Sequence, residues 1–141
     1  MKIYVASSWR NEQQQGVIDA LRDAGHEVYD FKNPREGDHV FKWSEIDLEW
    51  ESWGPIEYLD ALIHPIAEAG YGSDFDAMQW ADAFVGVHPF GRSASMKMGW
   101  AVGQGKKTVL ILADAEPELM VKMFDHIVTS VEEAVDVLKG E

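Results

Sequence analysis

Short apolar runs alternate with amphipathic stretches along most of the chain. Five runs rich in Val, Ile, Leu, Phe or Ala have the length of buried strands, and they lie at 3–6, 26–31, 83–87, 108–112 and 126–128. Between these runs, apolar residues recur every three or four positions, as they do on one face of a helix. Helices are predicted at 12–24, 55–68, 74–81, 116–124 and 131–139, and a further helix of about three turns is predicted to begin at Ser93 or Ser95.

Glycine, proline and serine mark where several of these helices begin and end. Gly25 is predicted to end the first helix, and Pro55 suits the first turn of the second. Pro65 is expected to end or kink that helix, because proline lacks the N–H of a helical residue. The residues at 70–72 are predicted to form a turn, after which Ser73 caps the next helix.

Strands and helices in alternation predict parallel strands joined by right-handed crossovers. The natural packing is an α/β fold with a five-stranded, doubly wound parallel sheet in three α/β/α layers, Rossmann or flavodoxin-like in kind. A chain of 141 residues has about the length of one domain, so residues 1–141 are predicted to form a single domain.

The alternation breaks down at 32–54, which is long for a connection within a compact domain. Long ordered loops are usually lids or binding loops. This loop contains Trp43, Trp50 and Trp53, with Phe41 close by. These rings would either stack on a flat ligand or hold an irregular segment onto the body of the protein or onto a second subunit.

Charge and composition exclude several classes of partner. The formal net charge is −13, whereas nucleic-acid polymers and anionic membranes require a basic surface. A small anionic ligand is compatible with this charge if its pocket is locally positive. The chain has no cysteine, which excludes thiol catalysis, and its histidines show no metal-ligand spacing. We therefore expect no metal, no cofactor, no signal sequence and no membrane span, in a cytoplasmic protein.

Polar residues gather in the two loops that follow the first and third predicted strands. Loops after parallel strands lie at the carboxyl edge of the sheet, where such sheets bind ligands. Glycine and serine at a helix start present N–H groups and hydroxyls that suit an anion. Each serine could equally cap its helix, and each arginine could be a solvated surface charge. The candidates are Ser7, Ser8, Arg10, Gly91, Arg92, Ser93 and Ser95.

Three further candidates each have two interpretations. Asp76, near a predicted helix start, either complements the helix dipole or contacts a ligand. Asp82, just before the third strand, is either hydrogen-bonded to the backbone or part of the site. His88, at the carboxyl end of that strand, either donates to a phosphate or base or is held by the backbone.

Three stretches carry a resemblance to a known family: KIYVASSWRN at 2–11, DFDAMQWADAFVGV at 74–87 and, most specific, GRSASMKMGWAVGQGKKTVLIL at 91–112. They resemble the nucleoside 2-deoxyribosyltransferase family and its nucleotide N-glycosidase relatives. Members of that family are five-stranded α/β proteins that usually form dimers or larger assemblies. They cleave or exchange the N-glycosidic bond of a nucleoside or its monophosphate.

The resemblance implies roles for single residues of this chain. Tyr4, Ser7 and Trp9 would lie beside the base or the sugar, and one of the two aspartates named above would interact with the substrate. Ser93 and Ser95 would meet a 5′-hydroxyl or a phosphate. The implied partners are a nucleoside or nucleoside monophosphate and further copies of this chain, in a homodimer or higher homo-oligomer.

One position departs from the family's pattern, because the family's catalytic glutamate falls at Lys97. In the family that carboxylate attacks the anomeric carbon. A lysine is cationic at neutral pH and opposes the positive charge of an oxocarbenium-like transition state. Lys97 is therefore an introduced change that disarms an enzyme, a natural feature of a member that binds without cleaving, or a change compensated by another carboxylate. The remaining interpretation is that Lys97 is out of register or extends to solvent.

These observations lead to two main hypotheses about function. The first is an enzyme of nucleoside or nucleotide metabolism, a 2-deoxyribosyltransferase or N-glycosidase, whose activity is impaired because Lys97 replaces the nucleophile. The second is a non-catalytic nucleotide-binding or sensing module in which Lys97 binds phosphate, with Ser93 one turn earlier on the same helix face. A structural homologue without a small ligand is a third alternative.

Overall fold

A computed structural model describes residues 1–38 and 40–139. The chain divides into two compact units: unit 1 is Met1–Asp30 together with Trp80–Glu141, and unit 2 is Phe31–Gln79. The prediction that residues 1–141 form one domain stays a prediction.

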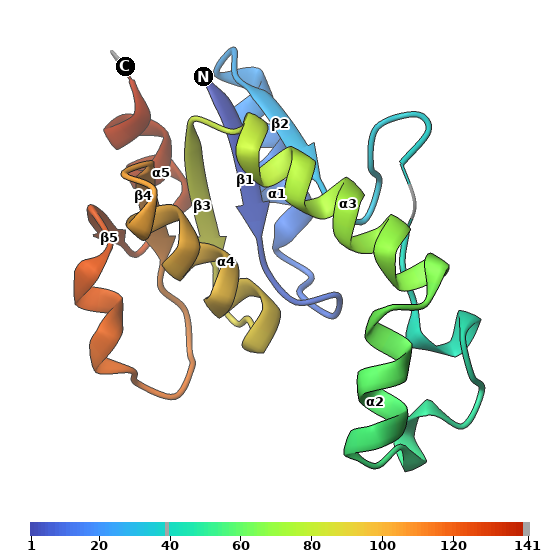
Figure 1. Cartoon of the computed structure of the whole chain (residues 1–141). Coiled ribbons are helices and arrows are strands. Elements are labelled where there is room, and N and C mark those ends of the chain that lie inside the picture. Colours follow the sequence, from blue (N-terminus) through green and yellow to red (C-terminus); the bar gives the residue numbers. More distant parts are fainter. Residues whose placement is uncertain (39, 140–141) are drawn as a thin grey trace. The chain divides into compact units, whose positions relative to one another are not determined.

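The described part of unit 1 is built around a five-stranded parallel sheet (Figure 1). The strand order is β2-β1-β3-β4-β5, the order of flavodoxin-like folds, so the predicted fold class is confirmed. The observed strand bounds differ from the predicted ones by no more than one residue. The strands are β1 Lys2–Ala6, β2 Glu27–Asp30, β3 Ala83–Val87, β4 Lys107–Ile111 and β5 His126–Val128.

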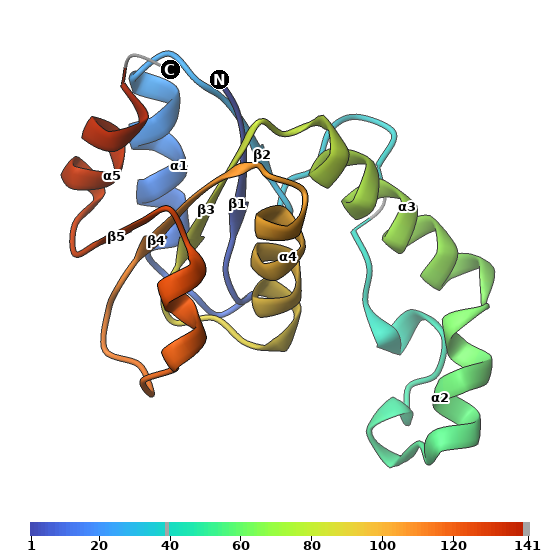
Figure 2. The same ribbon diagram turned by 60° about the vertical axis from the view of Figure 1, so that its left-hand side comes forward.

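Helices cover both faces of this sheet (Figure 2). Helices α1 (Gln14–Asp23) and α5 (Val131–Leu138) pack on one face, and α4 (Arg92–Gly103) packs on the other against β1, β3 and β4. The face beneath α1 and α5 is aliphatic, because alternate strand residues point to it. Its fully buried side chains include Ile3, Val5, Ile18, Leu21, Val85, Val109 and Leu138.

The face of the sheet beneath α4 carries a row of aromatic rings. Tyr29, Tyr4 and Phe84 are directly opposite one another in the strand register, on β2, β1 and β3. The Tyr4 ring is stacked on Tyr29 at 5.3 Å and on Phe84 at 5.2 Å between ring centroids. Trp100 of α4 lies 6.1 Å from Phe84. Such cross-strand ring pairs fix the register of β1 against both of its neighbours.

The segment after β4 differs from the prediction. A helix was expected at 116–124, whereas the structure has a 3-10 helix, η3, at Leu119–Met123. The Glu118 carboxylate caps it by accepting the Met120 N–H at 2.8 Å. Short helical segments in connections commonly take the tighter 3-10 form.

Unit 2 corrects the predicted turn at 70–72. Helix α2 (Pro55–Leu62) ends before Pro65, as predicted, but α3 (Pro65–Trp80) then runs unbroken through 70–72, and its last residue belongs to unit 1. Ser73 therefore lies inside a helix and caps none. Gly70 lets the Phe41 side chain pack directly against the backbone of α3, because a Cβ at position 70 would lie 2.6 Å from the Phe41 Cβ. Glycine was misread as a turn signal where it allows a side chain to approach a helix.

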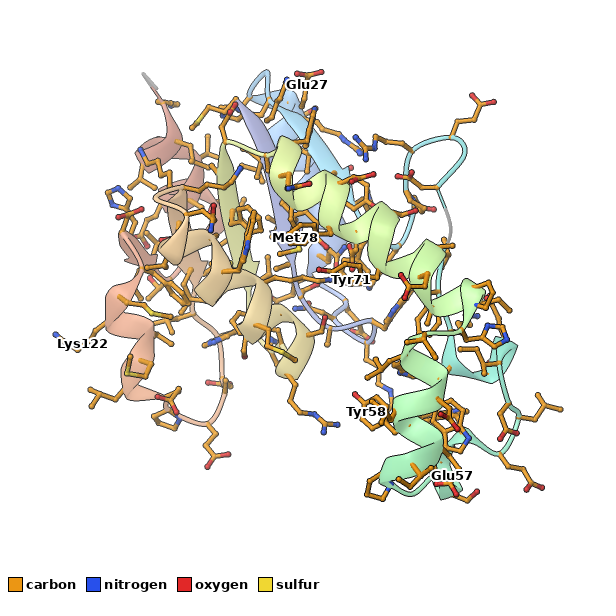
Figure 3. The ribbon with its side chains drawn as sticks, viewed as in Figure 1. Glu27, Glu57, Tyr58, Tyr71, Met78 and Lys122 are labelled. Atoms are coloured by element: carbon orange, nitrogen blue, oxygen red, sulfur yellow. The ribbon has the colours of Figure 1, made fainter. Side chains whose placement is uncertain are left out.

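The aromatic residues of the 32–54 segment pack on one another within unit 2. The Trp43 ring makes edge contacts with Phe41 at 4.6 Å, Trp53 at 5.7 Å and Tyr58 at 5.8 Å between centroids. Tyr58 comes from α2 (Figure 3). Trp43 and Trp53 therefore hold an irregular segment together. Among the described residues of this segment, the only helical pieces are 3-10 turns at Trp43–Glu45 and Trp50–Ser52.

Candidate functional site

The loops that follow β1 and β3 are joined at the carboxyl edge of the unit 1 sheet. Asn11 donates from Nδ2 to the carbonyl oxygens of Val87 at 2.9 Å and Pro89 at 3.1 Å. Ser8 Oγ also donates to the Pro89 carbonyl, at 3.4 Å. Residues 76 and 78 positions apart in sequence thus meet at one edge, which is the arrangement predicted from parallel crossovers.

The β1 loop exposes some of its candidate residues and buries another. Ser7 is 7% exposed and donates its hydroxyl to Gln14 Oε1, while Gln14 Nε2 donates to Asp30 Oδ1 at 2.8 Å. This buried chain links the ends of β1 and β2 to the start of α1. Trp9 is 50% exposed and Arg10 is exposed, so these two side chains are open to a ligand in solvent.

The other side of the edge consists of Gly91 and the first turn of α4. The Gly91 carbonyl accepts both the Ser95 N–H, at 3.1 Å, and the Ser95 hydroxyl, at 2.9 Å. Arg92 and Ser93 are exposed. The N–H groups of a first helical turn have no acceptor within the helix. Together with the Arg92 guanidinium and the Ser93 hydroxyl, they form a setting that favours an anion.

Lys97 lies over the strand residue Tyr4. Its Nζ is 5.4 Å from the centroid of the Tyr4 ring, and the Tyr4 ring is fully buried between its two neighbours in the aromatic row. An ammonium within about 6 Å of a ring face is attracted by the ring's quadrupole. Lys97 is half-buried. The Lys97 ammonium therefore lies over the aromatic row, and the match of position 97 to the family's glutamate stays a prediction.

Ser95 lies on the other side of α4 from Lys97. Successive helical residues turn by about 100°, so positions two apart point to nearly opposite sides. Ser95 lines a groove of about 490 Å³ together with His88, Phe90 and parts of the segment 115–124. The structure thus brings Lys97 to Tyr4 and places Ser95 in a separate groove.

His88 lines this groove and is held by the backbone. Its backbone N–H donates to the Ile111 carbonyl at 3.1 Å, and its ring lies 4.9 Å from the Phe90 ring. Burial lowers the pKa of the imidazole below its ordinary value, and a hydrogen bond with the backbone of Ala113 opposes this only in part. At neutral pH His88 is therefore uncharged, and it can offer a ligand a hydrogen bond but no positive charge.

The two predicted aspartates are placed differently from the loop residues. Asp82 precedes β3 and so lies at the amino edge of the sheet, opposite to the two loops. Its Oδ2 accepts the Lys2 N–H at 3.1 Å, and its own N–H donates to the Lys2 carbonyl at 2.7 Å. This is the backbone-bonded alternative, and the structure does not bring Asp82 to the carboxyl edge. Asp76 is exposed on α3 and belongs to unit 2.

Sequence reasoning missed the residues that organise the edge. Asn11, Gln14 and Asp30 are 4%, 1% and 3% exposed, and each bonds across elements. The available signal was their position: Asn11 and Asp30 follow or end a predicted strand, where buried polar groups must find partners. Gln14 was overlooked because it belongs to a run of three glutamines, a pattern typical of a solvated helix face.

Neither a metal cluster nor a membrane-spanning helix is found in the described residues. No group of three or more His, Asp or Glu side chains at 1–38 and 40–139 is arranged to hold a metal ion. No helix over the same residues is long and apolar enough to cross a bilayer.

The fold is shared with several solved structures. A 2-deoxyribosyltransferase from Bacillus psychrosaccharolyticus is 20% identical, with a TM-score of 0.60 over 96% of this chain and 91% of that one. A CMP N-glycosidase from Clostridium botulinum is 18% identical, with a TM-score of 0.51 over 98% of both chains. A conserved protein from Enterococcus faecalis is 12% identical, with a TM-score of 0.63 over 96% and 95%. No family model and no curated protein matches this chain. At these identities the likeness shows the fold.

Proposed function

We propose that this chain binds a nucleoside or nucleoside 5′-monophosphate at the carboxyl edge of unit 1. We further propose that it derives from proteins that cleave or exchange the N-glycosidic bond, with that chemistry impaired because Lys97 replaces the nucleophilic glutamate. Support comes from the fold shared with a 2-deoxyribosyltransferase and a CMP N-glycosidase over nearly the whole chain. The sequence motifs of 2–11 and 91–112 support the same assignment.

One observation carries the proposal: the 5.4 Å approach of Lys97 Nζ to the Tyr4 ring. The resemblance assigns Tyr4 to the neighbourhood of the sugar or base, and it assigns position 97 to the group that attacks the sugar. These two assignments come from separate motifs, one on β1 and one on α4. Their juxtaposition is what a single site requires, and no feature of either motif alone would produce it.

The alternative, a nucleotide-binding or sensing module without turnover, is favoured by the cations of this region. Lys97, Arg10 and Arg92 all belong to unit 1, in a chain whose net charge is −13. If they act on one ligand, they supply the local positive charge that an anionic group requires in an acidic protein. In this alternative the lysine at 97 binds the phosphate. The homo-oligomer and the cytoplasmic location stay predictions under either function.

Binding by calorimetry tests the proposal. We expect CMP and dCMP to bind the wild-type chain about tenfold more tightly than cytidine and deoxycytidine, because the phosphate gains a charge-assisted contact worth about 1.4 kcal/mol. Lys97→Gln should remove most of that difference and leave the affinity for the uncharged nucleosides nearly unchanged. A panel of the other common bases is measured in the same way.

Two outcomes would contradict the proposal in different ways. If no nucleoside or nucleotide of the panel binds or raises the melting temperature, the proposed function is wrong. If both forms bind equally and Lys97→Gln has no effect, the site is retained but the phosphate role of Lys97 is wrong. An exposed lysine elsewhere in unit 1 provides the matched control: Lys122→Gln on η3 should leave every affinity unchanged.

A further inference from the structure

We propose that Asn11 is a positioning residue for this site. Its side-chain amide holds the β1 and β3 loops in one arrangement, so ligand affinity depends on a group that does not touch the ligand. The inference rests on the proposed function, because it concerns the same carboxyl edge. The two hydrogen bonds from Asn11 Nδ2 to Val87 O and Pro89 O are called the Asn11 bridge.

The amide of Asn11 is fully used within the protein. A side-chain amide has two N–H donors. Both are accounted for by the bridge, at 2.9 and 3.1 Å. Oδ1 accepts the backbone N–H of Gln13 at 2.8 Å, and the backbone N–H of Asn11 donates to the Ser8 carbonyl at 3.1 Å. Asn11 is 4% exposed, so it has neither a donor nor the surface to contact a ligand directly.

The bridge connects the two loops that carry the exposed candidate residues. The β1 loop presents Trp9 and Arg10, and the β3 loop leads through Gly91 to Arg92. The Ser8 hydroxyl also links these loops, but at 3.4 Å to the Pro89 carbonyl its hydrogen bond is longer and weaker. A ligand held by both loops requires a fixed distance between them, and the bridge fixes that distance. Loops that are already fixed lose less conformational entropy when the ligand binds.

Asn11→Asp removes the bridge but keeps the hydrogen bond that the Asn11 side chain accepts from Gln13. The change keeps the oxygen that accepts the Gln13 N–H, and aspartate forms this short side-chain turn as asparagine does, so the turn before α1 is preserved. It removes both bridge donors and sets a carboxylate against two carbonyl oxygens. At about pH 8 we expect the dissociation constant for CMP to rise about tenfold or more, since the buried Val87 carbonyl loses the Asn11 amide and the Pro89 carbonyl keeps only the longer bond from Ser8. Gln13→Glu is the control: it makes the same amide-to-carboxyl change two residues away on an exposed side chain.

A pH series adds a readout that a general loss of stability would not give. Burial and the two facing carbonyls disfavour ionisation of the carboxyl introduced by Asn11→Asp, so its pKa is raised. Once protonated, that carboxyl donates one hydrogen bond and restores half of the bridge. As the pH falls from about 8 to about 5.5, the ratio of variant to wild-type dissociation constants should fall toward one. For Gln13→Glu the ratio should stay constant.

Hydrogen exchange in the absence of ligand tests the bridge independently of the proposed function. Backbone amides of 7–11 and of residues 88, 90 and 91 should exchange faster in Asn11→Asp than in wild type, while those of β4 and α5 should not change. If the wild type binds CMP and Asn11→Asp binds it equally well, the positioning role is wrong and the proposed function stands. If no nucleotide binds the wild type, the proposed function is wrong, and unchanged exchange in both loops would reject the bridge as well.

Discussion

Replacing Lys97 with glutamate is expected to raise base release from deoxynucleosides and their monophosphates about a thousandfold or more. A cation about 4 Å from an oxocarbenium-like centre costs about 4 kcal/mol at an effective dielectric of about 20. Each 1.36 kcal/mol is tenfold in rate, so removal of the cation alone corresponds to roughly three powers of ten. Lys97→Glu also supplies the carboxylate that the resemblance places at this position, over Tyr4.

Lys97→Gln distinguishes the two parts of this effect. It removes the positive charge without supplying a nucleophile, so it should release base more slowly than Lys97→Glu and leave no covalent intermediate. The release is followed by chromatography of the free base from each of the common deoxynucleosides and monophosphates. Equal, undetectable release by wild type, Lys97→Glu and Lys97→Gln, in variants that still bind nucleotide, would favour the binding module over the impaired enzyme.

Phe84→Ala is expected to lower the free energy of unfolding by about 3–5 kcal/mol, the range for truncation of a buried aromatic side chain. Phe84 is fully buried on β3, the central strand of the sheet, and its ring contacts those of Tyr4 and Trp100. The loss leaves a cavity beneath α4, in the layer that supports Lys97. Urea unfolding followed by circular dichroism provides the measurement.

Phe84→Leu is the matched control for the aromatic row. It keeps most of the buried volume, so its cost should stay below about 1.5 kcal/mol. A loss of similar size for both variants would mean that ring stacking, rather than filled volume, stabilises this face. If Phe84→Ala causes no measurable loss, the aromatic row does not stabilise the sheet beneath α4.

The sheet could be predicted from the sequence, because its strands are buried on both faces. Short runs rich in apolar residues marked all five strands of the described chain to within one residue. Unit 2 was less predictable. Its turn at 70–72 was wrong because glycine in a helix and glycine in a turn look alike in sequence, and only the Phe41 side chain decides between them.

The sequence predicted which edge of the sheet carries the candidate site, but it did not predict the contacts within that site. The meeting of the β1 and β3 loops followed from chain topology alone. The hydrogen bonds that hold them did not, because Asn11 and Gln14 are ordinary polar residues until their partners are placed. The resemblance assigns both Ser95 and Lys97 to the substrate, whereas two helical positions turn these side chains to opposite sides of α4. Asp82 was assigned to the site because it lies in a motif that resembles the family, although a residue that precedes a parallel strand lies at the amino edge of the sheet.

A crystal structure with a bound nucleoside monophosphate tests the central claim most directly. We predict ligand density at the carboxyl edge of unit 1, between the ends of β1 and β3, with the sugar or base beside Trp9 and the anionic group near Ser93. Density confined to the amino edge around Asp82, or to a surface that neither of the two loops forms, would contradict the account.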